Sequence, residues 1–225
     1  MATVYEALQR GRQEQAPTAP PLPRVSKPHP ARFGVEMRDL SGRIQSLFED
    51  RKPVTLGITA TDAGAGTSTV ARELAHHLVG EGRTVLLCGD PADLDVVRIA
   101  GGETETRTRS LALTSCPGLT VVDIADLHRR DSGYAGKAAF RHWLSENSRN
   151  FDFVIIDIPP VLEQRSWSGF MGSADGIIMV VEAERTRSEV VKSTAAVIAE
   201  ASGHVLGMVL NKRRQYIPRG LYKWL

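Results

Sequence analysis

One stretch decides the fold of this chain: Ile58–Ala75, which reads ITATDAGAGTSTVARELA. An apolar strand that begins at Val54 runs into a turn rich in glycine, and a helix follows at once. This order is typical of a phosphate-binding loop, in which glycines let backbone N–H groups surround phosphate oxygens and the positive end of the helix faces them. The stretch therefore predicts a site for nucleotide phosphates. A turn that merely joins strand to helix is the alternative.

The loop departs from the standard pattern GxxxxGK[ST] at two positions. Thr61 stands where the first glycine is expected, and Thr67 stands where the lysine is expected. Ser68 supplies the hydroxyl that holds Mg²⁺ in such loops, so we predict it as a metal ligand. The predicted nucleotide-binding residues of the loop are Gly64, Ala65, Gly66, Thr67, Ser68 and Thr69. The loop keeps its backbone cradle and its magnesium hydroxyl but lacks its cation.

A second motif supplies the carboxylate that a magnesium site needs. Residues 151–160 read FDFVIIDIPP, a buried strand that ends in Asp157. Acidic side chains at the carboxyl edge of a parallel sheet lie beside bound phosphates and their magnesium ion. We therefore predict Asp157 as a catalytic residue and, together with Ser68, as a ligand of Mg²⁺.

These two motifs resemble those of the bacterial tyrosine kinases of capsule and exopolysaccharide systems, the CpsD/CapB type, which are relatives of the MinD/ParA ATPases. In that family the loop reads roughly SxxPGEGK[ST]T and the second motif reads DFVIIDTPP. The resemblance covers most of residues 35–212. It implies a P-loop NTPase-like α/β fold, with ATP and Mg²⁺ as cofactors.

The alternation of apolar strands and helices along the chain independently predicts a three-layer fold, a mainly parallel sheet with helices on both faces. We expect adjacent buried strands to contain Ile58, Leu87, Ile156, Val180 and Val209. The phosphate loop and Asp157 should then meet at one edge of the sheet. Residues 101–117 are expected to be an exposed loop, and Trp167 and Phe170 are expected to be packing residues.

One strand end departs from the resembled family. Residues 85–95 read VLLCGDPADLD where the family reads VLLIDADLRRP, so Gly89 stands at the position of a magnesium-side aspartate. Asp90 is our second candidate catalytic residue, but it is displaced by one position, and strand side chains alternate between faces. The alternative is that Asp90 and Asp93 open a solvated turn. Asn211 follows the last predicted strand, where the resemblance implies a hydrogen bond to adenine; an ordinary turn residue is the alternative.

The chain divides into three parts by composition. Residues 1–34 form an N-terminal segment with a proline-rich linker, residues 35–212 form the kinase-like domain, and residues 213–225 form a basic-aromatic tail. Residues 3–10 place apolar side chains on one helical face, and a docking segment and a frayed terminus both remain open. A helix is expected from about residue 35 to residue 50, with an inward face of Met37, Leu40, Ile44, Leu47 and Phe48.

The tail is the second informative stretch and reads RRQYIPRGLYKWL. In the resembled family this end carries a tyrosine cluster that a neighbouring subunit phosphorylates, and the matching candidate phosphoacceptors here are Tyr216 and Tyr222. Aromatic and basic side chains together suit docking on a protein partner or a peripheral contact with anionic lipid headgroups. Packing of the tail on its own domain is the alternative.

Composition narrows the range of functions. The formal net charge of +2 does not favour a nucleic-acid binder, so no nucleic-acid partner is predicted. The two cysteines have no metal-ligand or CxxC spacing, which favours a reduced, cytoplasmic protein. No apolar run is long enough to span a membrane. The resemblance implies recruitment to the inner face of the plasma membrane by an inner-membrane polysaccharide co-polymerase of the Wzz, chain-length-determinant type. The oligomer is left open, because the helix before the first strand lacks the family's E-x-x-R-x-x-R motif.

Three functional hypotheses follow from the missing lysine. The first is a regulatory partner of the membrane co-polymerase in exopolysaccharide or capsule biosynthesis, with weak or no kinase activity. The second is an active ATP-dependent protein tyrosine autokinase, in which Arg72, Lys52 or a partner's residue replaces the lysine. The third is a positioning ATPase of the MinD/ParA type, which the absence of a second lysine near the loop start disfavours. Charge-assisted hydrogen bonds are worth about 1.5–3 kcal/mol each, so the loss of the lysine favours the first hypothesis.

Overall fold

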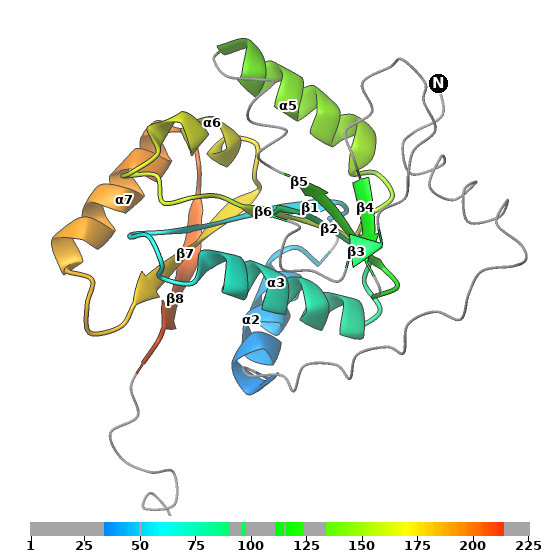
Figure 1. Ribbon diagram of the computed structural model, residues 1–225, viewed down its shortest axis with the longest axis horizontal. Coiled ribbons are helices and arrows are strands. Elements are labelled where there is room, and N and C mark those ends of the chain that lie inside the picture. Colours follow the sequence, from blue (N-terminus) through cyan, green and yellow to red (C-terminus); the bar gives the residue numbers. More distant parts are fainter. Residues whose placement is uncertain are drawn as a thin grey trace, which may run out of the picture.

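The computed structural model describes residues 34–49, 51–90, 96–97, 111–114, 116–123 and 134–213. Within them, eight strands form one sheet in the order β3-β4-β5-β2-β6-β1-β7-β8 (Figure 1). Six strands are parallel: β1 (Val54–Ala60), β2 (Val85–Gly89), β5 (Leu119–Asp123), β6 (Phe153–Asp157), β7 (Gly176–Glu182) and β8 (Val205–Asn211). Two short strands extend one edge through antiparallel pairs: β4 (Leu111–Thr114) and β3 (Val96–Val97).

Helices cover both faces of this sheet (Figure 1). One face carries α2 (Gly34–Leu47) and α3 (Thr67–Gly80). The other carries α5 (Tyr134–Asn147), the 3₁₀ turn η2 (Arg165–Trp167), α6 (Ser168–Met171) and α7 (Ser188–Glu200). Among the described residues, no helix combines the length and the apolar character needed to cross a membrane. The predicted three-layer α/β fold is confirmed.

Each face of the sheet has its own apolar core. Ile44 and Leu74 contribute to the core under α2 and α3, whereas Phe140 and Ile198 contribute to the core under α5 and α7. Every residue of β1 and β2 is buried, as expected for central parallel strands between two helical layers. This burial on both faces explains why these strands read as nearly continuous apolar runs.

The strand register brings the two sequence motifs together. The five residues expected in adjacent buried strands lie in β2, β6, β1, β7 and β8, which are neighbours in that order. The expected burial is wrong for β8, because it is the edge strand of the sheet and no residue in it is fully buried. Ile58 of β1 is paired with Asp157 of β6. Because these parallel strands end at the same edge, the loop after β1 and the carboxylate after β6 meet there, as predicted.

Two local expectations are wrong. Leu47 is 62% exposed, whereas Ser41 is buried and donates a 2.7 Å hydrogen bond to Glu81 at the end of α3. A polar contact therefore occupies part of the helix face for which the pattern indicated apolar side chains. The expected loop at residues 101–117 contains β4, which pairs with β5. A segment of four residues is too short for its apolar pattern to identify it as a strand. Pairing with β5 gives these residues their strand conformation.

Asp152 connects the segments that precede β1, β2 and β6 at the amino edge of the sheet. Its carboxylate accepts hydrogen bonds from the backbone N–H and the hydroxyl of Thr84, at 2.8 and 3.1 Å, and forms an ion pair with Lys52. Burial of the carboxylate opposes its charge, but the hydrogen bonds and Lys52 together keep the pKa of Asp152 below its usual value. The charged form therefore stabilises the fold.

We expect Asp152→Ala to lower the free energy of unfolding by about 2 kcal/mol near neutral pH, because hydrogen bonds to charged groups are worth about 1.5–3 kcal/mol. The folded pKa lies below the unfolded pKa, so this contribution is present above the unfolded value and is lost as the pH falls through the folded value. Urea unfolding should therefore show the gap between wild type and variant closing in acid. Asp39→Ala, at an exposed position of α2, is the control. A gap that stays constant into strong acid would contradict the charged-state explanation.

Candidate functional site

The predicted phosphate loop leaves β1 and enters α3 at the carboxyl edge of the sheet. Gly64 and Gly66 have φ values of 76° and 98°, in the left-handed region that favours glycine. Gly66 directly precedes α3, and no side chain caps that helix. The first N–H groups of a helix have no partners within it, and the helix dipole attracts anions there. The loop therefore has the backbone geometry of an anion site, with Thr67 where the lysine would stand.

Asn211, at the end of β8, forms a hydrogen bond to this loop. Its Nδ2 donates a 2.8 Å hydrogen bond to the carbonyl oxygen of Ala65, and its Oδ1 accepts one of 2.8 Å from the backbone N–H of Lys212. A Cβ on Gly66 would lie 2.2 Å from Nδ2, so glycine is needed here for the close approach as well as for φ. The amide of Asn211 thus holds the loop, and its contact with an adenine stays a prediction.

Asp157 and Ser68, predicted from separate motifs, lie in contact. Their side chains share a hydrogen bond in which the Ser68 hydroxyl is the donor. Burial has the largest effect on the pKa of Asp157 and raises it; the Ser68 bond and the charge of Arg72 lower it, and the charge of Asp90 raises it. The resulting pKa lies above the usual value of an aspartate.

A hydroxyl and a carboxylate supply the hard oxygen ligands that Mg²⁺ takes, and Mg²⁺ usually binds one or two protein groups together with substrate phosphates. The Ser68 and Asp157 side chains fit this description. In the described part of the chain, no group of three or more His, Cys, Asp or Glu residues could hold a metal ion. The predicted magnesium role of the pair therefore requires phosphate oxygens as further ligands, and it stays a prediction.

Gly89 ends β2 directly beside this carboxylate. A Cβ on Gly89 would lie 3.5 Å from the Cβ of Asp157, so an aspartate there would place a second carboxylate next to the first. Asp90 is exposed and one position further along the chain, yet its charge still acts on Asp157. The fold thus brings Asp90 near the site without giving it the position of Gly89. Its catalytic role stays a prediction.

Two further carboxylates contact the loop, and the sequence analysis did not select them. Asp62 accepts hydrogen bonds from the hydroxyls of Thr61 and Thr186, both at 2.9 Å. Glu163 Oε1 accepts a 2.9 Å hydrogen bond from the backbone N–H of Ala63. The sequence offers one indication that Glu163 lies near the loop. Glu163 follows the second motif closely, so its segment begins at the same edge of the sheet. The start of the loop therefore carries two carboxylates, while the lysine position further along it is occupied by Thr67.

The two cations considered as replacements for the lysine lie in different places. Arg72, on α3, is close enough to Asp157 for its charge to act on that carboxylate. Lys52 instead pairs with Asp152 at the amino edge of the sheet, opposite the loop. The expectation that Lys52 could replace the lysine is therefore wrong, because it precedes β1 whereas the loop follows it.

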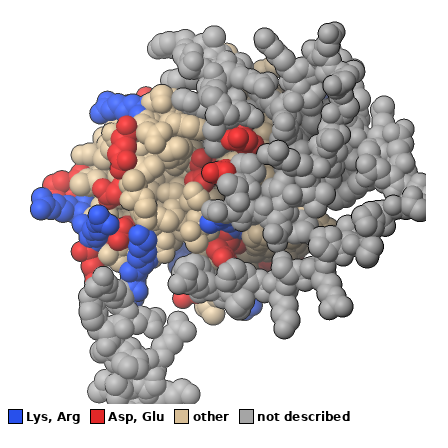
Figure 2. All heavy atoms as spheres, in the orientation of Figure 1, with Lys and Arg blue, Asp and Glu red and all other residues tan. Residues whose placement is uncertain are grey.

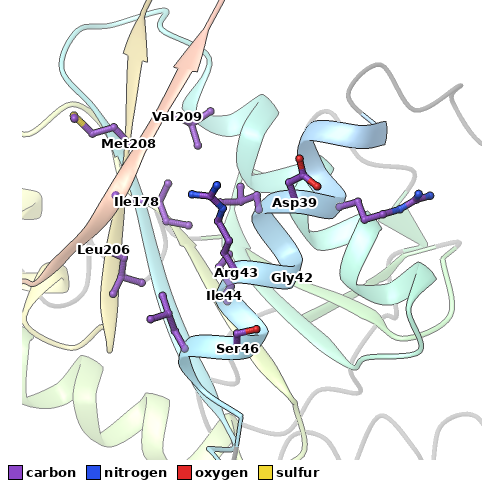
Figure 3. Close-up of a pocket in the computed structure, with 13 residues that line it drawn as sticks. Asp39, Gly42, Arg43, Ile44, Ser46, Ile178, Leu206, Met208 and Val209 are labelled. Atoms are coloured by element: carbon purple, nitrogen blue, oxygen red, sulfur yellow. The ribbon is translucent and has the colours of Figure 1, made fainter.

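A separate groove of about 910 Å³ lies between α2 and β8 (Figure 3). Ile44, Ile178 and Val209 line it, and Arg43 points from α2 toward β8. No residue of the phosphate loop lines it, so the groove is distinct from the predicted nucleotide site. On the face shown in Figure 2, acidic and basic side chains of the described residues are interspersed rather than gathered by sign.

Several predictions fall outside the described residues. These are the candidate phosphoacceptors Tyr216 and Tyr222, the acidic residue Asp93 and the N-terminal residues 1–33. The expected roles of the tail and of the N-terminal segment therefore rest on sequence alone. The same holds for the boundaries of the three predicted parts of the chain.

Comparison by sequence finds tyrosine kinases. No family model matches the chain. The chain is 25% identical over 183 residues to the tyrosine-protein kinase CpsD of Streptococcus agalactiae serotype III, and this alignment covers 76% of the chain and 79% of the kinase. It is 39% identical over 70 residues to the succinoglycan biosynthesis transport protein ExoP of Rhizobium meliloti, which covers 31% of the chain and 9% of ExoP.

Comparison by fold finds kinase domains as well. The kinase domain of the Escherichia coli tyrosine kinase ETK matches with a TM-score of 0.65 at 17% identity, covering 89% of this chain and 88% of that domain. The chimerical protein CapA2B2 matches with a TM-score of 0.59 at 22% identity, covering 79% and 85%. Cobyrinic acid a,c-diamide synthase from Mycobacterium smegmatis with bound ADP and magnesium has a TM-score of 0.53 at 21% identity, covering 70% and 74%. At these identities the structures show the fold alone. The relatives found by sequence and those found by fold both include bacterial tyrosine kinases, so the resemblance of the chain to that P-loop family is confirmed.

Proposed function

We propose that the chain is a tyrosine-kinase-like regulatory protein of capsule or exopolysaccharide biosynthesis that binds a magnesium nucleotide with weak or no kinase activity. One observation carries this proposal: Thr67 stands at the lysine position, while the glycine geometry and the contact between Ser68 and Asp157 are retained. The relatives support the biological setting, since CpsD is a tyrosine-protein kinase and ExoP is a succinoglycan biosynthesis transport protein.

The proposed partner is an inner-membrane polysaccharide co-polymerase. The 70 residues that match ExoP make up only 9% of that protein, so a segment similar to part of this chain occurs there within a much larger transport protein. This supports a functional interaction between proteins like this chain and polysaccharide transport proteins. We place the contact in the basic-aromatic tail, residues 213–225, which would hold the kinase-like domain, residues 35–212, at the cytoplasmic side of the membrane.

The proposed chemistry follows from the charges around the loop. Backbone N–H groups would hold the phosphates, and Ser68 and Asp157 would hold Mg²⁺, which supplies positive charge next to the phosphate oxygens. Asp62 and Glu163 add negative charge to the same loop. Preorganised electrostatics carries most of the catalysis of phosphoryl transfer, so we expect a rate about a hundredfold or more below that of a lysine-bearing site.

We expect nucleotide binding to depend on Mg²⁺, with an affinity for ADP that is about tenfold or more lower in its absence, because a lost charge-assisted contact is worth about 1.5–3 kcal/mol. Calorimetric titration of the full chain, with Mg²⁺ and with a chelator, measures this difference. Ser68→Ala should abolish most of the magnesium dependence, whereas Ser193→Ala, at an exposed position of α7, should preserve it. Failure of the wild type to bind nucleotide in either condition would overturn the proposed binding.

An active autokinase is the second candidate, and the charge of Arg72 near Asp157 is the observation that favours it. Incubation of the same protein with ATP separates the two candidates. Rapid phosphorylation of Tyr216 or Tyr222 that Asp157→Ala abolishes would favour the active kinase. Slow or absent phosphorylation, in a protein that binds nucleotide, would favour the regulatory role.

A further inference from the structure

Glu163 places a carboxylate on the phosphate loop. Its Oε1 accepts a 2.9 Å hydrogen bond from the backbone N–H of Ala63. A tight turn after β6 positions it, in which the backbone N–H groups of Glu163 and Gln164 donate to the carbonyl oxygen of Pro160 at 3.1 and 3.0 Å. Glu163 is exposed, so its side chain can be changed without opening either apolar core.

The contact lies on the outer side of the predicted phosphate site. In loops of this kind, the backbone around the glycines cradles the inner phosphates and a lysine reaches the outer ones. Ala63 precedes those glycines, and the turn with Glu163 follows Asp157, which together with Ser68 would hold the magnesium ion of the outer phosphates. A carboxylate bound at Ala63 therefore stands in the direction in which a third phosphate would extend.

The negative charge of Glu163 is not offset by a lysine, as it would be in a standard loop. Thr67 contributes no cation, and Asp62, next to Ala63, places a second carboxylate on the loop. The repulsion of two unit charges about 5 Å apart near a protein surface corresponds to about tenfold or more in affinity. A third phosphate would thus be more costly to bind here than in a loop that has its lysine.

We propose that Glu163 makes the loop selective for nucleoside diphosphates over triphosphates, with its carboxylate standing in for the terminal phosphate. This inference rests on the proposed nucleotide binding. A diphosphate leaves the hydrogen bond between Glu163 and Ala63 in place, whereas a triphosphate has to displace the carboxylate or bind beside it. The chain would then bind the diphosphate, which is the form that remains after phosphoryl transfer. Binding of the diphosphate could regulate the protein without hydrolysis of a triphosphate.

Calorimetric titration of the full chain with ADP and with a non-hydrolysable ATP analogue, both with Mg²⁺, tests this selectivity. We expect the wild type to bind ADP about tenfold or more tightly than the analogue. Glu163→Gln keeps an oxygen acceptor for Ala63 but removes the charge, so it should tighten the analogue about tenfold and change ADP little. Glu200→Gln removes one charge from the exposed end of α7 and is the matched control.

The outcomes separate this inference from the function on which it rests. Wild-type protein that binds both nucleotides equally, or an affinity ratio that Glu163→Gln leaves unchanged, would overturn the selectivity while nucleotide binding stands. Absence of binding to both nucleotides in wild type and variant would overturn the proposed binding and the selectivity together. Glu163→Ala is the second variant, and it should shift the ratio in the same direction if charge is the cause. Thermal unfolding verifies that each variant is folded.

Discussion

Replacing Thr67 by lysine should tighten the binding of magnesium-ATP about 10- to 100-fold. A charge-assisted hydrogen bond contributes about 1.5–3 kcal/mol, and each 1.4 kcal/mol corresponds to about a factor of ten in affinity. Thr67 is the first residue of α3, directly before Ser68, so the new ammonium group would approach the phosphates from the side of the helix start. It would also offset the negative charge of Asp62 and Glu163. Calorimetric titration with a non-hydrolysable ATP analogue measures the gain.

Thr67→Met is the matched control, because it adds an unbranched side chain of similar reach without a charge. Equal affinities of the lysine and methionine variants would contradict the electrostatic explanation. Autophosphorylation should rise less than affinity in the lysine variant. Gly89 still withholds the second carboxylate beside Asp157, so restoring one cation completes only part of the site.

Phe140→Ala should lower the free energy of unfolding by about 3–5 kcal/mol, a large share of the roughly 5–15 kcal/mol that stabilises a typical domain. Phe140 is 1% exposed, and its ring centroid lies 4.4 Å from that of Phe170 and 6.0 Å from that of Trp143. Trp167 lies 5.3 Å from Phe170 in turn. This aromatic cluster joins α5 to η2 and α6, and the alanine variant would leave a cavity at its centre.

Urea or guanidinium unfolding measures the loss, and Phe140→Leu is the control because it keeps most of the apolar volume. The leucine variant should lose clearly less stability than the alanine variant. A loss below about 1 kcal/mol for alanine would mean that the neighbouring rings collapse into the space. The chain between Asp157 and η2 carries Glu163, so a loosened cluster should also weaken the position of that carboxylate on the loop.

The sequence by itself determined the layers of the fold and the two motifs at one sheet edge. Apolar strands alternating with helices admit few arrangements other than a parallel sheet with both faces covered. In that arrangement, a loop after one strand and an aspartate at the end of another lie at the same edge of the sheet, and the pairing of β1 with β6 makes them neighbours. The contact between Ser68 and Asp157 follows from this geometry. The threonine at the lysine position was identifiable from the short loop motif, and Gly89 was identifiable from the comparison with the resembled family.

Only the tertiary structure decided what holds the phosphate loop and what charge surrounds it. Asn211 is 146 positions from Ala65, Thr186 is 124 positions from Asp62, and Glu163 is 100 positions from Ala63. Periodicity describes which face of an element is apolar, but it does not state which atoms of distant segments come within hydrogen-bond distance. Such contacts depend on strand order, turn geometry and side-chain rotamers together. The prediction that Lys52 could replace the lysine of the loop failed for the same reason. The sequence shows the charge of Lys52, but the edge of the sheet at which it lies depends on the whole fold.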